Sequence, residues 1–452
     1  MDGASDSAHS DTVKYRTKLA ELSHKLREAP TQQDGYLLFL HGMLLRKLGM
    51  RDQALDTLIS SINACPGNWA AWLELAKCFS HHDQVSRYNS LLPTGVMQRF
   101  YLAHVAVEFH HGADDSQTHA KIDELMTLFP ASAYLLAQRG LCYYNHRQYE
   151  EAEQVFRMLH LHDPESVDYM DVYSNILFVS DNHGELSVLA QACSRTDKYR
   201  PETCVVVGNY YGMKNLHEKA ILYFQRAIAL NASYLSAWTL LGHEYLEVNN
   251  AHAALEAYRR ALDISHRDYR AWFGLGQTYE MLKMEYYALH YFQKAAELRP
   301  GDGRMWSALA SVYDALGKKL DSIRCWRRAL SDYRDLLEGN SDNLITDDCA
   351  DEKIPYQDGL SLLQLAKMLE DTDQQQQARK TYLLFVKKCD HEEHSAANVA
   401  SALKFLGRYA TKHGAWESAE EYGKALLAMG GAEKEEGKAL LGEIRLSRRN
   451  VV

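Results

Sequence analysis

Two consecutive stretches of 34 residues decide the fold of this 452-residue chain. They read LSAWTLLGHEYLEVNNAHAALEAYRRALDISHRD at 235–268 and YRAWFGLGQTYEMLKMEYYALHYFQKAAELRPGD at 269–302. Residues of the same kind recur at the same places in both: Trp238 and Trp272, Gly242 and Gly276, and Ala254 and Ala288. A repeat of this length is typical of helix pairs that stack, because one pair cannot bury its apolar face alone.

Within a unit, the apolar residues fall at helical spacing. Trp238, Leu241 and Tyr245 share one face of a first helix, because positions three and seven residues apart lie on the same side. The facing stripe of a second helix consists of Ala254, Tyr258 and Ala261. The asparagines at 249–250 favour a turn between the two helices. The pattern is the signature of the tetratricopeptide repeat (TPR).

The same spacing continues over most of the chain. Six units run from 133 to 336, although the unit 167–200 is degenerate, with Ser174 in place of glycine and Leu186 in place of alanine. The prediction is an all-α, right-handed superhelical solenoid of about eleven TPR units. In order, we expect an N-terminal tail and first helix (1–34), N-terminal TPR units (35–132), six contiguous units (133–336), an acidic inserted loop (337–358), and C-terminal units with a closing helix (359–452).

Tryptophans and prolines recur at fixed positions within the repeat, and each position predicts a structural role. We expect the tryptophans in the core rather than as stacking platforms for bases, because their position within the repeat does not vary. Prolines are expected just beyond the second helices, where they end a helix; they are Pro66, Pro130, Pro164 and Pro300.

Composition argues against several classes of protein. With 50 Lys and Arg against 60 Asp and Glu, the formal net charge is −10, which disfavours a nucleic-acid-binding surface. The 8 cysteines include no CxxC pair, which disfavours zinc ribbons, RING domains and thioredoxin-like redox sites. The N-terminus is not expected to be a signal peptide, and no stretch approaches the roughly 20 apolar residues that span a membrane. We expect a protein of the nucleus and cytoplasm.

No motif predicts chemistry. GLGQTY at 274–279 begins like a dinucleotide fingerprint, but it ends in Tyr279 and no strand precedes it. HEEH at 391–394 lacks the second histidine of HExxH, since Ser395 stands there. Three histidine pairs have no partners at ligand spacing: His81/His82, His110/His111 and His160/His162. We expect no catalytic residue, no metal, no cofactor and no small-molecule substrate.

The first helices of stacked TPR units line a groove in which partner proteins bind. Positions 2, 5, 9, 12 and 13 of each unit are expected to point into it. The predicted partner-binding residues are Asn209, Thr239, His243, Glu247, Arg270, Gln277, Glu280, Arg304, Ser307 and Asp314. Because Glu247, Glu280 and Asp314 are acidic, an extended peptide that carries an arginine would match this groove.

Several stretches resemble one family beyond the repeat consensus. They are RPETCVVVGNYY (200–211), HEKAILYFQRAIALN (217–231), YLSAWTLLGHEYLE (234–247), RDYRAWFGLGQTYEMLKM (267–284), LRPGDGRMW (298–306) and EEGKALLGEIRL (435–446). From about residue 165 to the end, the chain resembles the eighth subunit of the anaphase-promoting complex (cyclosome), the Cdc-twenty-three family. The N-terminal third resembles that family mainly in repeat layout.

The resemblance implies a non-catalytic scaffold in a ubiquitin ligase that acts in the cell cycle, cell division and mitosis. It implies binding to sister TPR subunits, a homodimer formed by the N-terminal repeats, and a groove for the basic C-box segment of activator proteins. The alternative is a generic TPR adaptor in intraflagellar transport, RNA processing or a co-chaperone complex. A co-chaperone would need a carboxylate-binding lysine and asparagine where this chain has Val205 and Leu240.

Overall fold

The computed structural model describes residues 17–26, 34–79, 82–109, 115–334, 337, 354–388, 396–429 and 432–451. Most of the predicted N-terminal tail, most of the predicted acidic loop and the HEEH sequence therefore lie outside the described residues. The chain divides into two compact units, Met1–Val248 and Asn249–Val452.

The N-terminal unit consists of consecutive helices. Residues 17–26 are helical. They are followed by α2 (Gly35–Lys47), α3 (Arg51–Ala64), α4 (Trp69–Cys78), α5 (His82–Tyr88), the short η1 (Asn89–Leu91), α6 (Val96–Phe109), α7 (Asp115–Leu128), α8 (Ala133–Asn145), α9 (Tyr149–His162), α10 (Met170–Val179), α11 (His183–Thr196), α12 (Pro201–Met213), α13 (His217–Leu230) and α14 (Leu235–Glu247).

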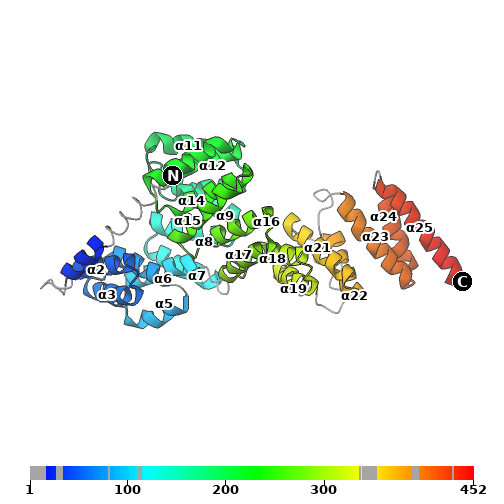
Figure 1. Cartoon of the computed structure of the whole chain (residues 1–452), viewed down its shortest axis with the longest axis horizontal. Helices are drawn as coiled ribbons and strands as arrows, with labels where there is room; N and C mark the ends of the chain where they lie inside the picture. Colours follow the sequence, from blue (N-terminus) through cyan, green and yellow to red (C-terminus); the bar gives the residue numbers. More distant parts are fainter. Residues whose placement is uncertain are drawn as a thin grey trace. The chain divides into compact units, whose positions relative to one another are not determined.

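The C-terminal unit continues in the same way. Its elements are α15 (Ala251–Ile264), α16 (Tyr269–Met281), α17 (Glu285–Leu298), α18 (Gly303–Ala315), α19 (Lys319–Ala329), η2 (Ser331–Tyr333), α21 (Tyr356–Asp371), α22 (Gln375–Lys388), α23 (Ala396–Lys412), α24 (Trp416–Ala428) and α25 (Ala432–Val451). Helix α21 begins at Tyr356, before the predicted start of that unit at 359. Figure 1 shows α23, α24 and α25 at the C-terminal end, where α24 packs on both of the others.

The all-α prediction is confirmed. Apart from one bridge residue, Ile354, every described element is a helix or a turn, and neighbouring helices pack in pairs such as α2 with α3 and α16 with α17. The handedness of the superhelix stays a prediction. Among the described helices, none is both long and apolar enough to cross a membrane.

The turn inside each helix pair repeats one backbone state. The second residue after the first helix has a positive φ at six places spaced by 34 residues: Arg147, Asp181, Asn215, Asn249, Lys283 and Gly317. The angles lie between 53° for Asp181 and 72° for Gly317. Gly317 adopts this left-handed region without steric strain, and Asp181, Asn215 and Asn249 are of the other residue types that tolerate it, which leaves Arg147 and Lys283 as the unfavourable cases.

The recurrent glycines are explained by close packing on the second helix. A Cβ atom at Gly276 would lie 2.5 Å from Phe292 Cδ1, and one at Gly208 would lie 2.5 Å from Phe224 Cε1. Both phenylalanines are fully buried. Glycine therefore gives the aromatic ring of the same repeat the space that a side chain would occupy.

The recurrent tryptophans play a different part from the one expected. Trp238, Trp272 and Trp306 are only half-buried, although Trp272 and Trp306 pack against a core cluster, so the prediction that they are core residues holds only in part. Each indole Nε1 donates to a backbone carbonyl six residues earlier: Trp238 to Ala232 at 2.9 Å, Trp272 to His266 at 2.9 Å, and Trp306 to Pro300 at 2.8 Å. The indole thus fixes the turn between consecutive repeats, which explains the constant position.

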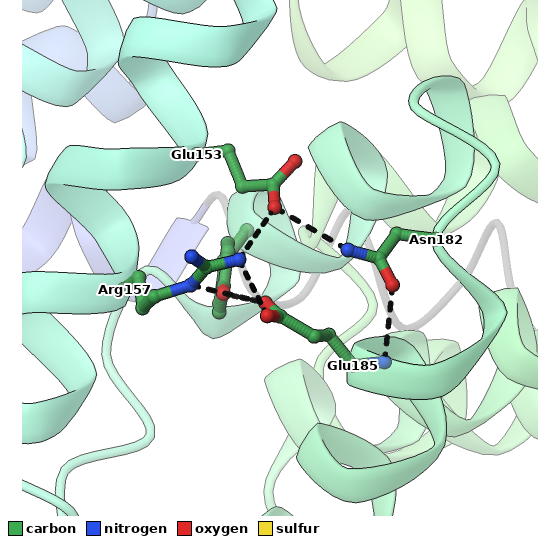
Figure 2. A network of polar contacts seen from close by, with 5 residues as sticks. Glu153, Arg157, Asn182 and Glu185 are labelled. Atoms are coloured by element: carbon green, nitrogen blue, oxygen red, sulfur yellow. Dashed lines mark hydrogen bonds and ion pairs between the residues drawn. The ribbon is translucent and has the colours of Figure 1, made fainter.

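The degenerate repeat 167–200 joins the repeat before it through polar contacts (Figure 2). Arg157 of α9 contacts Glu185 of α11, and its Nη2 lies 2.9 Å from Glu153 Oε1. Asn182 Nδ2 donates to Glu153 at 3.3 Å, while its Oδ1 accepts from the Glu185 backbone amide at 3.3 Å. The Tyr173 hydroxyl donates to Glu185 Oε2 at 3.0 Å. This network bridges α9, α10 and α11.

Candidate functional site

Two predicted groove residues of the N-terminal unit are buried. Asn209 of α12 is 4% exposed, and its Nδ2 donates to Ser174 Oγ at 2.8 Å and to Asn175 Oδ1 at 2.7 Å. Thr239 of α14 is 3% exposed, and its hydroxyl donates to the Ser236 carbonyl at 3.0 Å. The expectation that both side chains point into an open groove is therefore wrong. Asn209 instead joins α12 to α10, whereas Thr239 bonds within its own helix α14.

The end of α14 does present polar side chains to solvent. Glu247 is exposed and His243 is half-buried. Beside them Glu244, which the sequence did not single out, is buried, with Oε2 2.9 Å from His217 Nδ1 of α13. Burial raises the pKa of Glu244, the bond to His217 lowers it, and the nearby Glu247 charge raises it. Glu247 thus remains the accessible carboxylate at this end of α14.

In the C-terminal unit, Arg304 is already engaged. Its Nη2 lies 2.9 Å from Asp302 Oδ2, and its Nε lies 3.2 Å from Asp302 Oδ1. Asp302 is also the N-cap of α18 and accepts from the Arg304 backbone amide at 3.1 Å. Arg270 follows the equivalent cap, Asp268, and its guanidinium lies 5.7 Å from the Tyr269 ring centroid. Asp302 therefore partly balances the charge of Arg304, whose side chain remains 45% exposed.

The other predicted residues of this unit leave acidic groups exposed. Gln277 and Glu280 of α16 and Asp314 of α18 are exposed, and the Ser311 hydroxyl lies 3.4 Å from Glu280 Oε1. Glu280 and Asp314 hold the same position in consecutive repeats. Neighbouring protein atoms desolvate the Glu280 carboxylate and raise its pKa, while the Ser311 contact lowers it.

Ser307 makes a local contact instead of joining this acidic pair. It is half-buried, and its hydroxyl donates to the Arg304 carbonyl at 3.0 Å within α18. Of the ten predicted residues, Asn209 and Thr239 are buried, and His243, Arg270 and Ser307 are half-buried. Arg304 is paired with Asp302, and the remaining four, Glu247, Gln277, Glu280 and Asp314, are exposed.

One group of potential metal ligands was missed at the sequence level. His119, Cys142 and His146 lie together on α7 and at the end of α8. The sequence did contain a sign of this group: Cys142 and His146 are four residues apart, a spacing that places both on one face of a helix. Neither residue belongs to a pair of neighbouring histidines.

Comparisons with known proteins agree with the repeat architecture and add a family. Residues 6–140 match the family model described as "Anaphase promoting complex subunit 8 / Cdc23". Residues 239–283 and 269–302 match tetratricopeptide-repeat models. The match at 6–140 corrects the expectation that the N-terminal third resembles this family mainly in repeat layout.

Relatives match along nearly the whole chain. It is 45% identical over 417 residues to anaphase-promoting complex subunit 8 of Dictyostelium discoideum, covering 92% of this chain and 66% of that protein. It is 44% identical to the Arabidopsis thaliana protein of the same name, covering 92% of this chain and 67% of that one. The chain thus spans about two thirds of the length of these relatives.

A solved structure supports the fold. The crystal structure of the APC/C hetero-tetramer Cut9-Hcn1 contains a chain that aligns with 95% of this one, covering 81% of that chain at a TM-score of 0.63 and 15% sequence identity. Identity at that level shows the fold alone. Together with the sequence matches, which extend over nearly the whole chain, the comparisons place this chain in the anaphase-promoting complex subunit 8 (Cdc23) family.

Proposed function

We propose that this chain is a non-catalytic TPR scaffold subunit of the anaphase-promoting complex, an E3 ubiquitin ligase of the cell cycle. The observation that carries the proposal is the 45% identity over 92% of the chain to a protein named as a subunit of that complex. Such relatives are named for the assembly they belong to, and not for a reaction, which supports the prediction that the chain is not an enzyme. The generic adaptor becomes the weaker alternative.

Affinity purification tests this assignment. The tagged full chain, expressed in its own cells, is recovered and its partners are identified by mass spectrometry. We expect sister TPR subunits together with cullin-like and RING subunits, because those supply ubiquitin transfer in such a ligase. Recovery of a different assembly without these subunits would support the adaptor alternative and contradict the proposal.

Within this function, the exposed carboxylates are proposed to receive the basic C-box segment of activator proteins. Glu280 and Asp314, both of the C-terminal unit, are the main pair in this proposal, and Glu247 of the N-terminal unit is proposed as a separate contact. The competing cation Arg304 is paired with Asp302 at 2.9 Å, which partly balances its charge. A partly desolvated carboxylate such as Glu280 also gains more from an arginine than a fully hydrated one would.

Charge reversal tests the groove. A fluorescent C-box peptide is titrated with the full chain and with Glu247→Lys and Glu280→Lys variants, and anisotropy gives the affinity. Each variant is expected to weaken binding about tenfold or more, because one charge-assisted hydrogen bond is lost and a repulsion is gained. The matched control is Glu297→Lys, which reverses an exposed glutamate on the second helix α17. Equal losses in all three variants would point to general electrostatics and not to this groove.

The remaining expectations belong to the same proposal. The N-terminal repeats at 35–132 are proposed to form a homodimer, and the protein is proposed to act in the nucleus and cytoplasm. Light scattering on the purified full chain measures its mass directly. A mass that stays monomeric at micromolar concentration would contradict the homodimer while leaving the scaffold assignment intact.

A further inference from the structure

Three metal-ligating side chains converge between two neighbouring repeats of the N-terminal unit. Cys142 Sγ of α8 lies 3.5 Å from His119 Nε2 of α7 and 3.7 Å from His146 Nδ1 at the C-cap of α8. No two of the three ligand atoms are more than 4.8 Å apart. Cys142 is buried and both histidines are half-buried, so the cluster is largely shielded from solvent.

These distances are close to those of a tetrahedral zinc site. Zinc binds thiolate sulfur at about 2.3 Å and imidazole nitrogen at about 2.0–2.1 Å, so sulfur and nitrogen ligands on one tetrahedral ion lie about 3.5 Å apart. Both sulfur–nitrogen distances here are near that value. The two nitrogens need only approach one another to complete three corners of the tetrahedron.

The donor set also favours zinc over harder cations. One thiolate with two imidazoles suits Zn²⁺, whereas Mg²⁺ and Ca²⁺ prefer oxygen ligands. The spacing of Cys142 and His146 brings both onto one helical face. The His119 ring lies 4.8 Å from the Tyr143 ring, which orients it toward the sulfur. Arg139 is the nearest cation described on α8, and it is balanced by Asp123 at 3.7 Å.

We propose that His119, Cys142 and His146 bind one Zn²⁺ that links α7 to α8. Binding releases the thiol proton of Cys142 to solvent, and the fourth coordination position is left to a water molecule. The link would reinforce a boundary with a small apolar core, which contains Ala103, Val107, Ile122, Leu125, Leu135 and Cys142. This inference concerns stability and does not depend on the proposed scaffold function.

Metal titration of the chelator-stripped full chain tests the proposal. Zn²⁺ alone is added under reducing conditions, and calorimetry gives the stoichiometry. Co²⁺ then serves as a spectroscopic probe, because a bound thiolate gives a charge-transfer band that imidazoles alone do not give. We expect one tight ion per chain, the thiolate band, and a rise in melting temperature on adding Zn²⁺.

Two variants separate this site from chance binding. Cys142→Ser should abolish the thiolate band and the Zn²⁺-dependent rise in melting temperature, and His119→Gln should weaken binding at least tenfold. His119 is only half-buried, so the second variant remains informative if Cys142→Ser fails to fold. The control replaces His160 and His162 of α9 by alanine and should bind zinc as the parent does. Unchanged binding in both site variants, or no stoichiometric binding in the parent, would overturn the proposal.

Discussion

Repeats 269–302 and 167–200 have the same length but are held together differently. In the first, Gly276 leaves space for the fully buried ring of Phe292. In the second, Ser174 stands at the glycine position and Ala190 at the phenylalanine position, so the pair lacks its large member. The first repeat packs around an aromatic ring, whereas the second combines a core of smaller apolar residues, such as Leu186 and Leu189, with polar contacts.

Hydrogen bonds of this repeat's first helix, α10, connect it to later repeats. Ser174 Oγ donates to the Asp171 carbonyl at 2.7 Å and accepts from Asn209 at 2.8 Å. Asp171 in turn accepts from the Tyr234 hydroxyl at 2.6 Å. Apolar packing tolerates small shifts, whereas a buried polar group that loses its partner is destabilising. The degenerate repeat therefore has an apolar core without the consensus ring and adds polar contacts to its neighbours.

The largest effect is expected from removing the ring of the regular repeat. Phe292→Ala should lower the free energy of unfolding by about 3–5 kcal/mol, because it leaves a cavity beside Gly276. Urea denaturation followed by circular dichroism measures the change. Tyr286→Ala on the same helix is the control and should be nearly neutral, since Tyr286 is 72% exposed. Similar losses in both variants would contradict the packing argument.

A smaller but still clear loss is expected in the degenerate repeat. Asn209→Ala should lower the free energy of unfolding by about 1–3 kcal/mol, because buried groups of Ser174 and Asn175 lose a partner. A double-mutant cycle with Ser174→Ala isolates the interaction. Gln277→Ala, at an exposed position, should have little effect. If Asn209→Ala left stability unchanged but weakened peptide binding, Asn209 would be a groove residue after all.

The smallest effect, with the opposite sign, is expected at Asp171. Burial raises the pKa of this carboxyl, and the Tyr234 hydroxyl only partly offsets that. The folded state therefore binds the proton more tightly than the unfolded state, and its stability falls as pH rises from the unfolded pKa through the raised folded pKa. Asp171→Asn mimics the protonated form and keeps an acceptor for Tyr234.

The measurement is the difference in melting temperature between the Asp171→Asn variant and the parent as a function of pH. The variant should have the higher melting temperature at neutral pH. The difference in melting temperature should shrink as pH falls through the raised pKa of Asp171 toward the usual range of aspartate. Asp56→Asn, on an exposed position of α3, should show no such trend. A variant that melts lower than the parent at neutral pH would show that the Asp171 charge is stabilising.

Sequence alone was enough to predict the helix pairs, because glycine, alanine and aromatic positions report contacts inside one repeat. The sequence did not reveal that Asn209 is buried, because its burial depends on Ser174 and Asn175 in a neighbouring repeat that departs from the consensus. Arg304 was likewise assigned to the groove, although Asp302, two residues earlier, holds it. Glu280 and Asp314 are exposed in regular repeats, whereas Thr239 is buried in an equally regular one, so the position within the repeat does not by itself determine exposure.

The place of the inserted segment has a consequence for how the chain can change over evolutionary time. It lies between α19 and α21, at a boundary between repeats, and these two helices still pack on one another. Trp326 and Leu362 on either side belong to one apolar cluster. Doubling the length of such a connection costs only about 0.6 kcal/mol of loop entropy. The boundary can therefore accept sequence of new length and composition, and with it new regulation, without any repeat being rebuilt.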